Sequence, residues 1–145
     1  MTDKFYKDLD TGKVFENKAL ALIKKKYPLA YIIDGYYKEW DIYIPELEMG
    51  IEVKSDAQYQ KTGNFYVEYE CRKKPSGIST TKSKYYFIYL DVLYIIKTDT
   101  LKNKCRKYLN TKKDKIGGDY KASKGIIIPI KELQYESRRF NFLHN

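Results

Sequence analysis

The segment that most constrains the fold is residues 85–89 (YYFIY), a short run that is almost entirely apolar. A run of this kind is typical of a strand buried on both faces, which needs a packed layer above it and another below it. Residues 51–55 (IEVKS) and 64–72 (NFYVEYECR) instead alternate apolar and polar side chains. That alternation predicts strands with a single buried face. The chain is therefore expected to build around a central sheet.

Helical signals flank these strands. Apolar residues recur at helical spacing over 11–26 and stop at Pro28, and a basic helix is expected from about 100 to 113, capped by Thr98 or Asp99. Further strands are predicted at 29–37, 40–45 and 125–130, the last broken by Pro129, with a short basic helix after it. The pattern predicts an α/β (α+β) fold: one mixed sheet flanked by helices. With 145 residues, the chain fits a single domain, 1–145.

Composition excludes several classes of protein. Hydrophobic residues make up 43% and charged residues 32%, as in globular chains, and no run approaches the length of a membrane span. The first ten residues have no apolar signal-peptide core, so secretion is not expected. Two cysteines, Cys71 and Cys105, do not require a disulfide framework. Because the only histidine is His144, next to the end, enzymatic chemistry here must use carboxylates, lysines, tyrosines or a hard metal ion.

The positive charge is concentrated in the last third of the chain. The net charge is +9, and residues 101–145 hold 12 basic and 4 acidic side chains. A basic region of about 98–145 is expected of a surface that meets a polyanion such as nucleic acid. The alternative is a solvated, lysine-rich surface that reflects composition alone.

Three residues between 40 and 55 form the most informative constellation. Asp41 begins one predicted strand, and Glu52 and Lys54 share one face of the next strand. In an antiparallel pair of strands, these side chains converge at one end of the sheet. Two carboxylates held together repel each other, and a divalent cation with oxygen ligands relieves that repulsion. Magnesium can polarise a phosphodiester, and a neighbouring lysine can orient the attacking water or neutralise developing charge.

The spacing Asp41, Glu52-Val53-Lys54, preceded by Glu16 on a helix, resembles the PD-(D/E)XK nuclease superfamily, whose smaller members include phage nucleases and Holliday-junction resolvases. Trp40 stands where the family has proline. The resemblance covers about residues 12–90. It implies a restriction-endonuclease-like core in αβββαβ order, with 98–145 as a basic C-terminal extension.

The same resemblance implies roles for individual residues. Asp41, Glu52 and the carbonyl of Val53 would hold Mg²⁺ or Mn²⁺, Glu16 would bind a second metal or its water, and Lys54 would position the nucleophile. Glu68 lies on a strand expected to pair with residues 51–55, where it is a further candidate to approach the metal or orient Lys54. Its alternative is a place on a solvent-facing charged strand, together with Glu70. Residues 76–82 hold hydroxyls that suit either phosphate contacts or ordinary turns.

The function expected is that of a metal-dependent DNA endonuclease acting in the cytoplasm, that of the host if a phage encodes the chain. A homodimer is expected if the substrate is duplex or branched DNA, because two strands need two sites. Two other classes stay open: a non-catalytic nucleic-acid-binding protein with a nuclease-like fold, and a small phage host-interaction protein. The expected phosphate contacts are basic side chains of the last third: Lys102, Lys104, Arg106, Lys107, Lys121, Lys124, Arg138 and Arg139.

Overall fold

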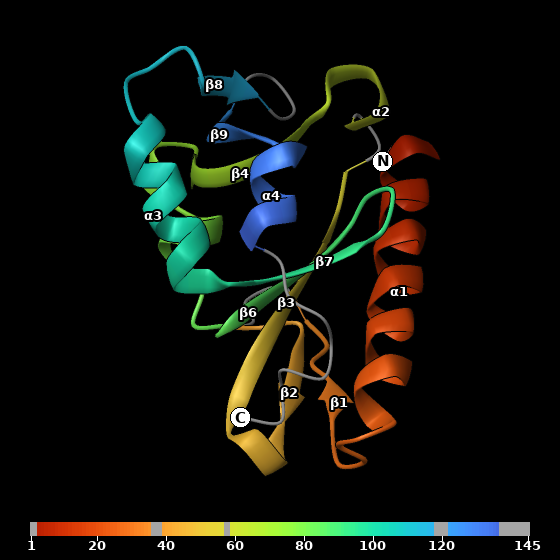
Figure 1. The fold of residues 1–145 in the computed structure, drawn as a ribbon. Coiled ribbons are helices and arrows are strands. Elements are labelled where there is room, and N and C mark those ends of the chain that lie inside the picture. Colours follow the sequence, from red (N-terminus) through yellow and green to blue (C-terminus); the bar gives the residue numbers. More distant parts are fainter. Residues whose placement is uncertain (1–2, 36–38, 57–58, 118–121, 137–145) are drawn as a thin grey trace.

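Helix α1 lies along one face of a five-stranded sheet, and a second, four-stranded sheet packs beyond the opposite face (Figure 1). The computed structural model describes residues 3–35, 39–56, 59–117 and 122–136. The elements in chain order are α1 (Asp3–Lys24), β1 (Tyr31–Ile32), β2 (Ile42–Ile44), η1 (Pro45–Leu47), β3 (Met49–Ser55), α2 (Tyr59–Thr62), β4 (Asn64–Cys71), β5 (Lys74–Pro75), η2 (Gly77–Ser79), β6 (Tyr85–Tyr89), β7 (Leu93–Lys97), α3 (Thr98–Tyr108), β8 (Asp114–Gly117), β9 (Ser123–Pro129) and α4 (Ile130–Glu136).

The first sheet has the strand order β1-β2-β3-β6-β7 and is mixed. Strands β3 and β6 run parallel, and the other pairs are antiparallel. The apolar run predicted to be a central strand is β6, which lies between β3 and β7. Its side chains alternate between two hydrophobic clusters, with Phe87 on the α1 side and Tyr86 and Ile88 on the other. The predictions of a mixed α/β class and of a strand buried on both faces are therefore confirmed.

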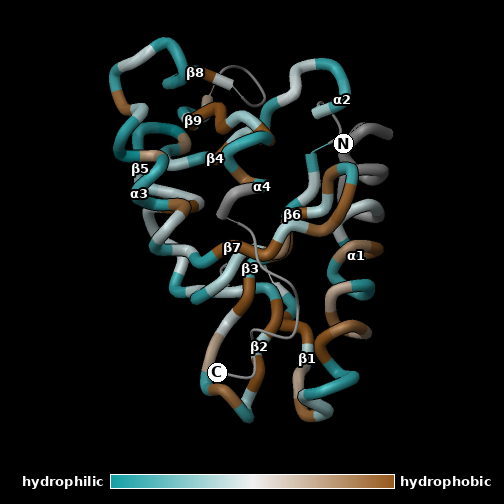
Figure 2. Tube along the Cα trace, viewed as in Figure 1, coloured by the Kyte–Doolittle hydropathy of each residue, from teal (hydrophilic) through white to brown (hydrophobic). Residues whose placement is uncertain are grey.

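The cluster on the α1 side joins the helix to the sheet. Ala19 and Ile23 of α1 are fully buried against Ile51 and Val53 of β3 and against neighbouring strands. The residues of β3 that alternate with Ile51 and Val53 therefore point their side chains away from α1. Figure 2 shows hydrophobic residues gathered along β2, β6 and β7, while α2 is hydrophilic.

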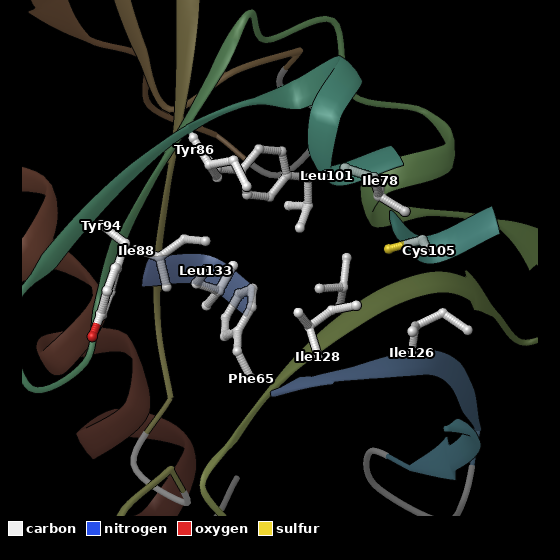
Figure 3. Close-up of a cluster of buried hydrophobic side chains, with 12 residues drawn as sticks. Phe65, Ile78, Tyr86, Ile88, Tyr94, Leu101, Cys105, Ile126, Ile128 and Leu133 are labelled. Carbon is white, nitrogen blue, oxygen red and sulfur yellow. The ribbon is translucent and has the colours of Figure 1, made fainter. Parts of the chain in front are cut away.

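The second cluster fills the space between the two sheets (Figure 3). Sheet two has the order β5-β4-β9-β8, and its inward side chains include Phe65 and Val67 of β4 and Ile128 of β9. Helices α3 and α4 contribute Leu101 and Leu133, both completely buried. Helices α3 and α4 and strand β9 thus surround this core.

Two expectations about the sheets were wrong. Strand β4 does not pair with β3, whose neighbours are β2 and β6, and the strands form two sheets rather than one. The physical reason is that the alternation in residues 51–55 and 64–72 fixes which side chains share a face and does not fix which strands pair. Strand β7 (Leu93–Lys97), which was not predicted, closes the far side of β6.

The helix limits also differ from those expected. Helix α1 begins at Asp3 rather than near residue 11, and α3 ends at Tyr108 rather than near 113. Neither Thr98 nor Asp99 caps α3, because Lys97 is its N-cap residue and makes no capping hydrogen bond through its side chain. The chain leaves α3 through Asn110, which has a left-handed φ of 61° and whose N–H donates to the Asp114 carboxylate at 3.0 Å. That hydrogen bond connects Asn110, just after α3, to Asp114, the first residue of β8. The two cysteines, Cys71 and Cys105, are free.

Gly50 of β3 gives a direct test of this packing. A Cβ added at Gly50 would overlap the indole ring of Trp40, whereas a Cβ at Gly12 of α1 meets nothing within 4 Å. Gly50→Ala should therefore lower the free energy of unfolding by about 1–3 kcal/mol. Gly12→Ala should leave it unchanged or raise it by about 0.5–1 kcal/mol. Urea denaturation measures both changes, and a Gly50→Ala variant as stable as the Gly12→Ala variant would contradict the packing described.

Candidate active site

Asp41 lies just before β2, beside the middle of β3. Its N–H donates to the carbonyl of Ile51 at 3.0 Å, and its own carbonyl accepts from the N–H of Ile33 at 2.9 Å. Its carboxylate Oδ2 accepts a hydrogen bond from the N–H of Val53 at 2.8 Å. The carboxylate thus takes a place on β3 that a backbone carbonyl would fill if β2 continued. Backbone bonds fix both ends of the residue, and only 6% of Asp41 is exposed.

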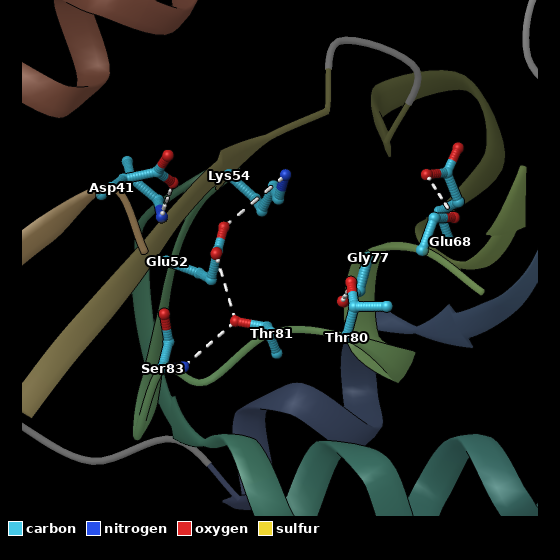
Figure 4. A network of polar contacts seen from close by, with 10 residues as sticks. Asp41, Glu52, Lys54, Glu68, Gly77, Thr80, Thr81 and Ser83 are labelled. Carbon is cyan, nitrogen blue, oxygen red and sulfur yellow. Dashed lines mark hydrogen bonds and ion pairs between the residues drawn. The ribbon is translucent and has the colours of Figure 1, made fainter. Parts of the chain in front are cut away.

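Glu52 and Lys54 project from β3 on the face away from α1, as the alternation predicts. The Glu52 side chain is only 12% exposed, and its Oε2 lies 3.8 Å from the Lys54 Nζ. Its Oε1 accepts a hydrogen bond from the Thr81 hydroxyl at 3.1 Å. Thr81 is held in turn by the N–H of Ser83, which donates to Thr81 Oγ1 at 3.1 Å. Figure 4 shows Asp41, Glu52 and Lys54 together at β3, with Thr81 approaching from the segment before β6.

The environment of Glu52 favours its neutral form. Burial raises the pKa of Glu52 to about 7, and the Asp41 carboxylate contributes to that rise by repulsion and by a hydrogen bond between the two carboxyl groups. Lys54 and the Thr81 hydroxyl act against this, because each stabilises the ionised form. Burial also raises the pKa of Tyr86, which pairs with Glu52 across β3 and β6, and the charge of Glu52 adds to that rise. Asp41 and Glu52 therefore form a mutually repelling pair that any nearby cation would relieve.

The structure does not bring Glu16 into this pair. Helix α1 covers the face of β3 that bears Val53, while Glu52 and Lys54 point to the other face. Within residues 3–35, 39–56, 59–117 and 122–136, no group of three or more His, Cys, Asp or Glu side chains is placed to hold a metal ion. Val53 enters the cluster through its N–H, which is a donor and cannot coordinate a cation. Metal binding by Glu16 and by the Val53 carbonyl stays a prediction.

Glu68 lies across a cavity from Lys54, on the second sheet rather than beside β3. The cavity has a volume of about 190 Å³, and its lining includes Lys54, Glu68, Tyr86 and the inward side chains of β4. The Glu68 carboxylate accepts a hydrogen bond from the Ser76 hydroxyl at 2.9 Å. Gly77, with a φ of +53°, comes so close that a Cβ there would overlap the carbonyl of Glu68. Glu68 therefore lines the same cavity as Lys54, with its carboxylate bonded to Ser76.

Sequence reasoning did not find the role of Thr81. The hydroxyls of residues 76–82 suit either phosphate contacts or turns, and neither interpretation connects Thr81 to a carboxylate 29 positions earlier in the chain. The connection exists because β6 pairs in parallel with β3, which brings the segment before β6 to this part of β3, where Thr81 reaches Glu52. Only the topology of the sheet could have indicated it.

The predicted phosphate contacts fall into three groups. Lys102, Lys104, Arg106 and Lys107 lie on α3, whose Leu101 and Cys105 face inward. Lys124 on β9 lies 3.6 Å from the carboxylate of Glu70, which offsets its charge. Lys121, Arg138 and Arg139 lie outside the described residues. Helix α3 therefore carries most of the predicted phosphate contacts that lie among the described residues.

Comparison of the chain with protein-family models, with curated proteins and with solved structures found no match. The resemblance to PD-(D/E)XK nucleases therefore stays an expectation from the sequence motif. Among the described residues, none of the helices combines the length and the apolar character that crossing a membrane requires.

The raised pKa of Glu52 predicts a pH-dependent stability. Because the folded-state pKa of about 7 exceeds the ordinary value of 4.5, the contribution of protonated Glu52 is complete below pH 4.5 and is lost as the pH rises through 7. Between pH 5 and pH 8, wild type should lose on the order of 2 kcal/mol relative to Glu52→Gln, which cannot ionise. Urea denaturation across this range measures the difference. Asp34→Asn, which removes an exposed carboxylate, should follow wild type; parallel curves for Glu52→Gln and wild type would contradict the assignment.

Proposed function

We propose that this protein is a divalent-metal-dependent DNA endonuclease with a restriction-endonuclease-like core. The observation that carries the proposal is the buried pair of carboxyl groups, Asp41 and Glu52, with Lys54 beside them on β3. Structural proteins rarely bury two acids against each other without a compensating charge. Such perturbed acids are typical of catalytic sites, where a substrate or a cation completes the electrostatics.

The donor set fits a hard divalent cation. Asp41 keeps one carboxylate oxygen on the Val53 N–H, and the charge of Glu52 is only partly compensated by Lys54 at 3.8 Å. Magnesium is commonly bound through one or two carboxylates, with water and substrate phosphate completing its shell, so two acids suffice. When bound, the ion would supply Lewis-acid stabilisation of phosphate charge and a water of lowered pKa. Manganese suits the same oxygen ligands.

The residues of the chain have distinct tasks in this proposal. Asp41 and Glu52 hold the cation, and the Thr81 hydroxyl fixes the rotamer of Glu52 by donating to its Oε1. Lys54, whose side chain is 48% exposed, reaches from the buried pair toward the cavity shared with Glu68. Its ammonium group is placed to neutralise charge on a phosphate or to orient a water. DNA would follow the basic residues of α3, and a homodimer would place one site on each strand of a duplex.

A second candidate function is that of a nucleic-acid-binding protein without catalysis. The observation that favours it is the absence of a third acidic ligand beside Asp41 and Glu52 among the residues that the structure describes. In that case the pair would be a remnant of a nuclease site, and α3 would still bind DNA. Cleavage measured alongside binding separates the two functions.

The cleavage test uses substitutions with different expected effects. Asp41→Asn keeps an oxygen that can accept from the Val53 N–H but removes the charge that holds a cation. Cleavage of plasmid and four-way-junction DNA in Mg²⁺ should fall by several orders of magnitude, while DNA binding persists. Lys54→Ala should reduce cleavage by about 10²–10³-fold with metal binding retained. Lys54→Arg should rescue little, because a planar guanidinium presents its charge differently.

Matched controls are Asp34→Asn and Lys61→Ala, which change exposed residues that are not part of β3. Both should cut at the wild-type rate, and EDTA should stop every active variant. If pure Asp41→Asn and Lys54→Ala proteins cut as fast as wild type, the nuclease proposal fails at this site. If wild-type protein binds DNA but never cuts it, the non-catalytic function replaces it.

The role of α3 is tested by the dependence of DNA affinity on salt. Replacing Lys104, Arg106 and Lys107 with glutamine should flatten the slope of log K against log [salt] by about 0.9 for each phosphate that the helix no longer neutralises. Affinity should fall on all sequences alike, because these side chains read no bases. A control with Lys13, Lys24 and Lys61 changed to glutamine removes the same charge elsewhere. Equal slopes for the two triple variants would move the DNA surface away from α3.

A further inference from the structure

A second cavity is lined by Thr81, the residue whose hydroxyl donates to Glu52. It has a volume of about 510 Å³ and lies between the start of β3, the segment before β6 and the beginning of α3. That volume is within the range of small-ligand sites. Four lysines line it: Lys82, Lys84, Lys97 and Lys102.

Two residues that line the same cavity, Ser83 and Thr98, carry buried hydroxyl groups without partners in the described part of the chain. Ser83 is 4% exposed and Thr98 is 3% exposed, and among the described residues neither hydroxyl has a hydrogen-bond partner. Buried polar groups are nearly always satisfied, so each exception needs an explanation. Serine and threonine hydroxyls are donors, and a ligand with several acceptor oxygens would satisfy both.

The helix that begins at this cavity adds to its positive potential. Helix α3 starts at Thr98, and its N-cap residue, Lys97, brings no side-chain cap to the helix terminus. The positive end of a helix dipole favours an anion within its first turn. The Thr98 N–H donates to the carbonyl of Lys84 at 3.0 Å, which fastens the helix start to the segment before β6. The hydroxyls and lysines are therefore carried by two segments that are bonded to each other.

The acidic side chains that line the cavity do not cancel the positive charge of its lysines. Glu48 and Asp99 also line the cavity. Lys82 is engaged with Glu39 at 3.0 Å, which leaves three lysines against the two carboxylates. Among the described residues, Lys84, Lys97 and Lys102 form no ion pair, so their charges are available to a ligand.

We propose that this cavity binds a phosphate group through Lys84, Lys97, Lys102 and the hydroxyls of Ser83 and Thr98. Phosphate matches the site because it offers several acceptor oxygens and a negative charge at once. Thr81 lines the cavity and also donates to Glu52, so the bound phosphate would lie next to the candidate active site. Phosphate binding itself does not depend on cleavage. Its assignment to a DNA strand, as an internal phosphodiester or a terminal phosphate, rests on the proposed function.

The test titrates inorganic phosphate into the full chain by calorimetry, in EDTA so that no divalent metal contributes. Wild type should bind with millimolar or better affinity. The Lys84→Gln, Lys97→Gln double variant and Thr98→Val should each weaken binding at least about fivefold, a change of roughly 1 kcal/mol. Thr98→Val keeps the shape of the side chain and removes only the hydroxyl. A Lys13→Gln, Lys61→Gln double variant controls for the loss of charge, and urea denaturation confirms that each variant is folded.

A second arm identifies the source of the phosphate. Short single-stranded DNA is titrated with and without a 5′-phosphate into wild type and the same variants. A drop in affinity for the phosphorylated DNA alone identifies a terminal phosphate, and an equal drop for both identifies a phosphodiester. Absence of phosphate binding by wild type up to about 10 mM, or equal binding by all folded variants, would overturn the proposal. Phosphate binding without any DNA cleavage would uphold the cavity and defeat only the nuclease function.

Discussion

The hydrogen bond from the Val53 N–H to the Asp41 carboxylate holds the candidate active site against the sheet. A buried carboxylate is stable only where donors reach it, and here β3 supplies the Val53 N–H because β2 begins only at Ile42, opposite Ile51, and does not extend beside Val53. The bond fixes Asp41 against β3 at the position from which Glu52 projects. Two acids that would separate in a flexible chain are thus kept together by strand register, and the resulting repulsion contributes to the raised pKa of Glu52.

Strand β6 organises what surrounds this pair. Its parallel register with β3 places Tyr86 beside Glu52 and brings Thr81, just upstream, within reach of the same carboxylate. Its continuation into β7 and α3 then brings Thr98 back to Lys84. The candidate active site and the lysine-lined cavity are therefore neighbours that share Thr81. A phosphate in that cavity and a cation at Asp41 and Glu52 would carry opposite charges.

Local patterns in the sequence predicted much of this arrangement and missed its long-range part. The alternation in residues 51–55 correctly placed Glu52 and Lys54 on one face, and the apolar run 85–89 correctly indicated a central strand. The partner of β3 was wrong because period-2 alternation specifies faces, not neighbours. Glu16 was matched by its position before the motif, yet α1 covers the face that Val53 shares with the core. The positions of Thr81 and Ser83 carry no spacing signal, since both depend on a parallel strand pair.

The parallel pairing of β3 with β6 also affects the order in which the molecule can assemble. The connection between these strands contains β4, whose long partner, β9, lies more than fifty residues further along the chain. During synthesis the β2–β3 hairpin, with Asp41 and Glu52, can form early from local contacts, whereas β4 has only the two-residue β5 beside it until β9 is made. Contacts so distant in sequence slow folding, and an unpaired strand edge invites association with other chains. Strand β4, which carries Glu68 on the wall of the cavity shared with Lys54, is therefore paired along its length only once β9 has been made, and its edge is open to association with other chains until then.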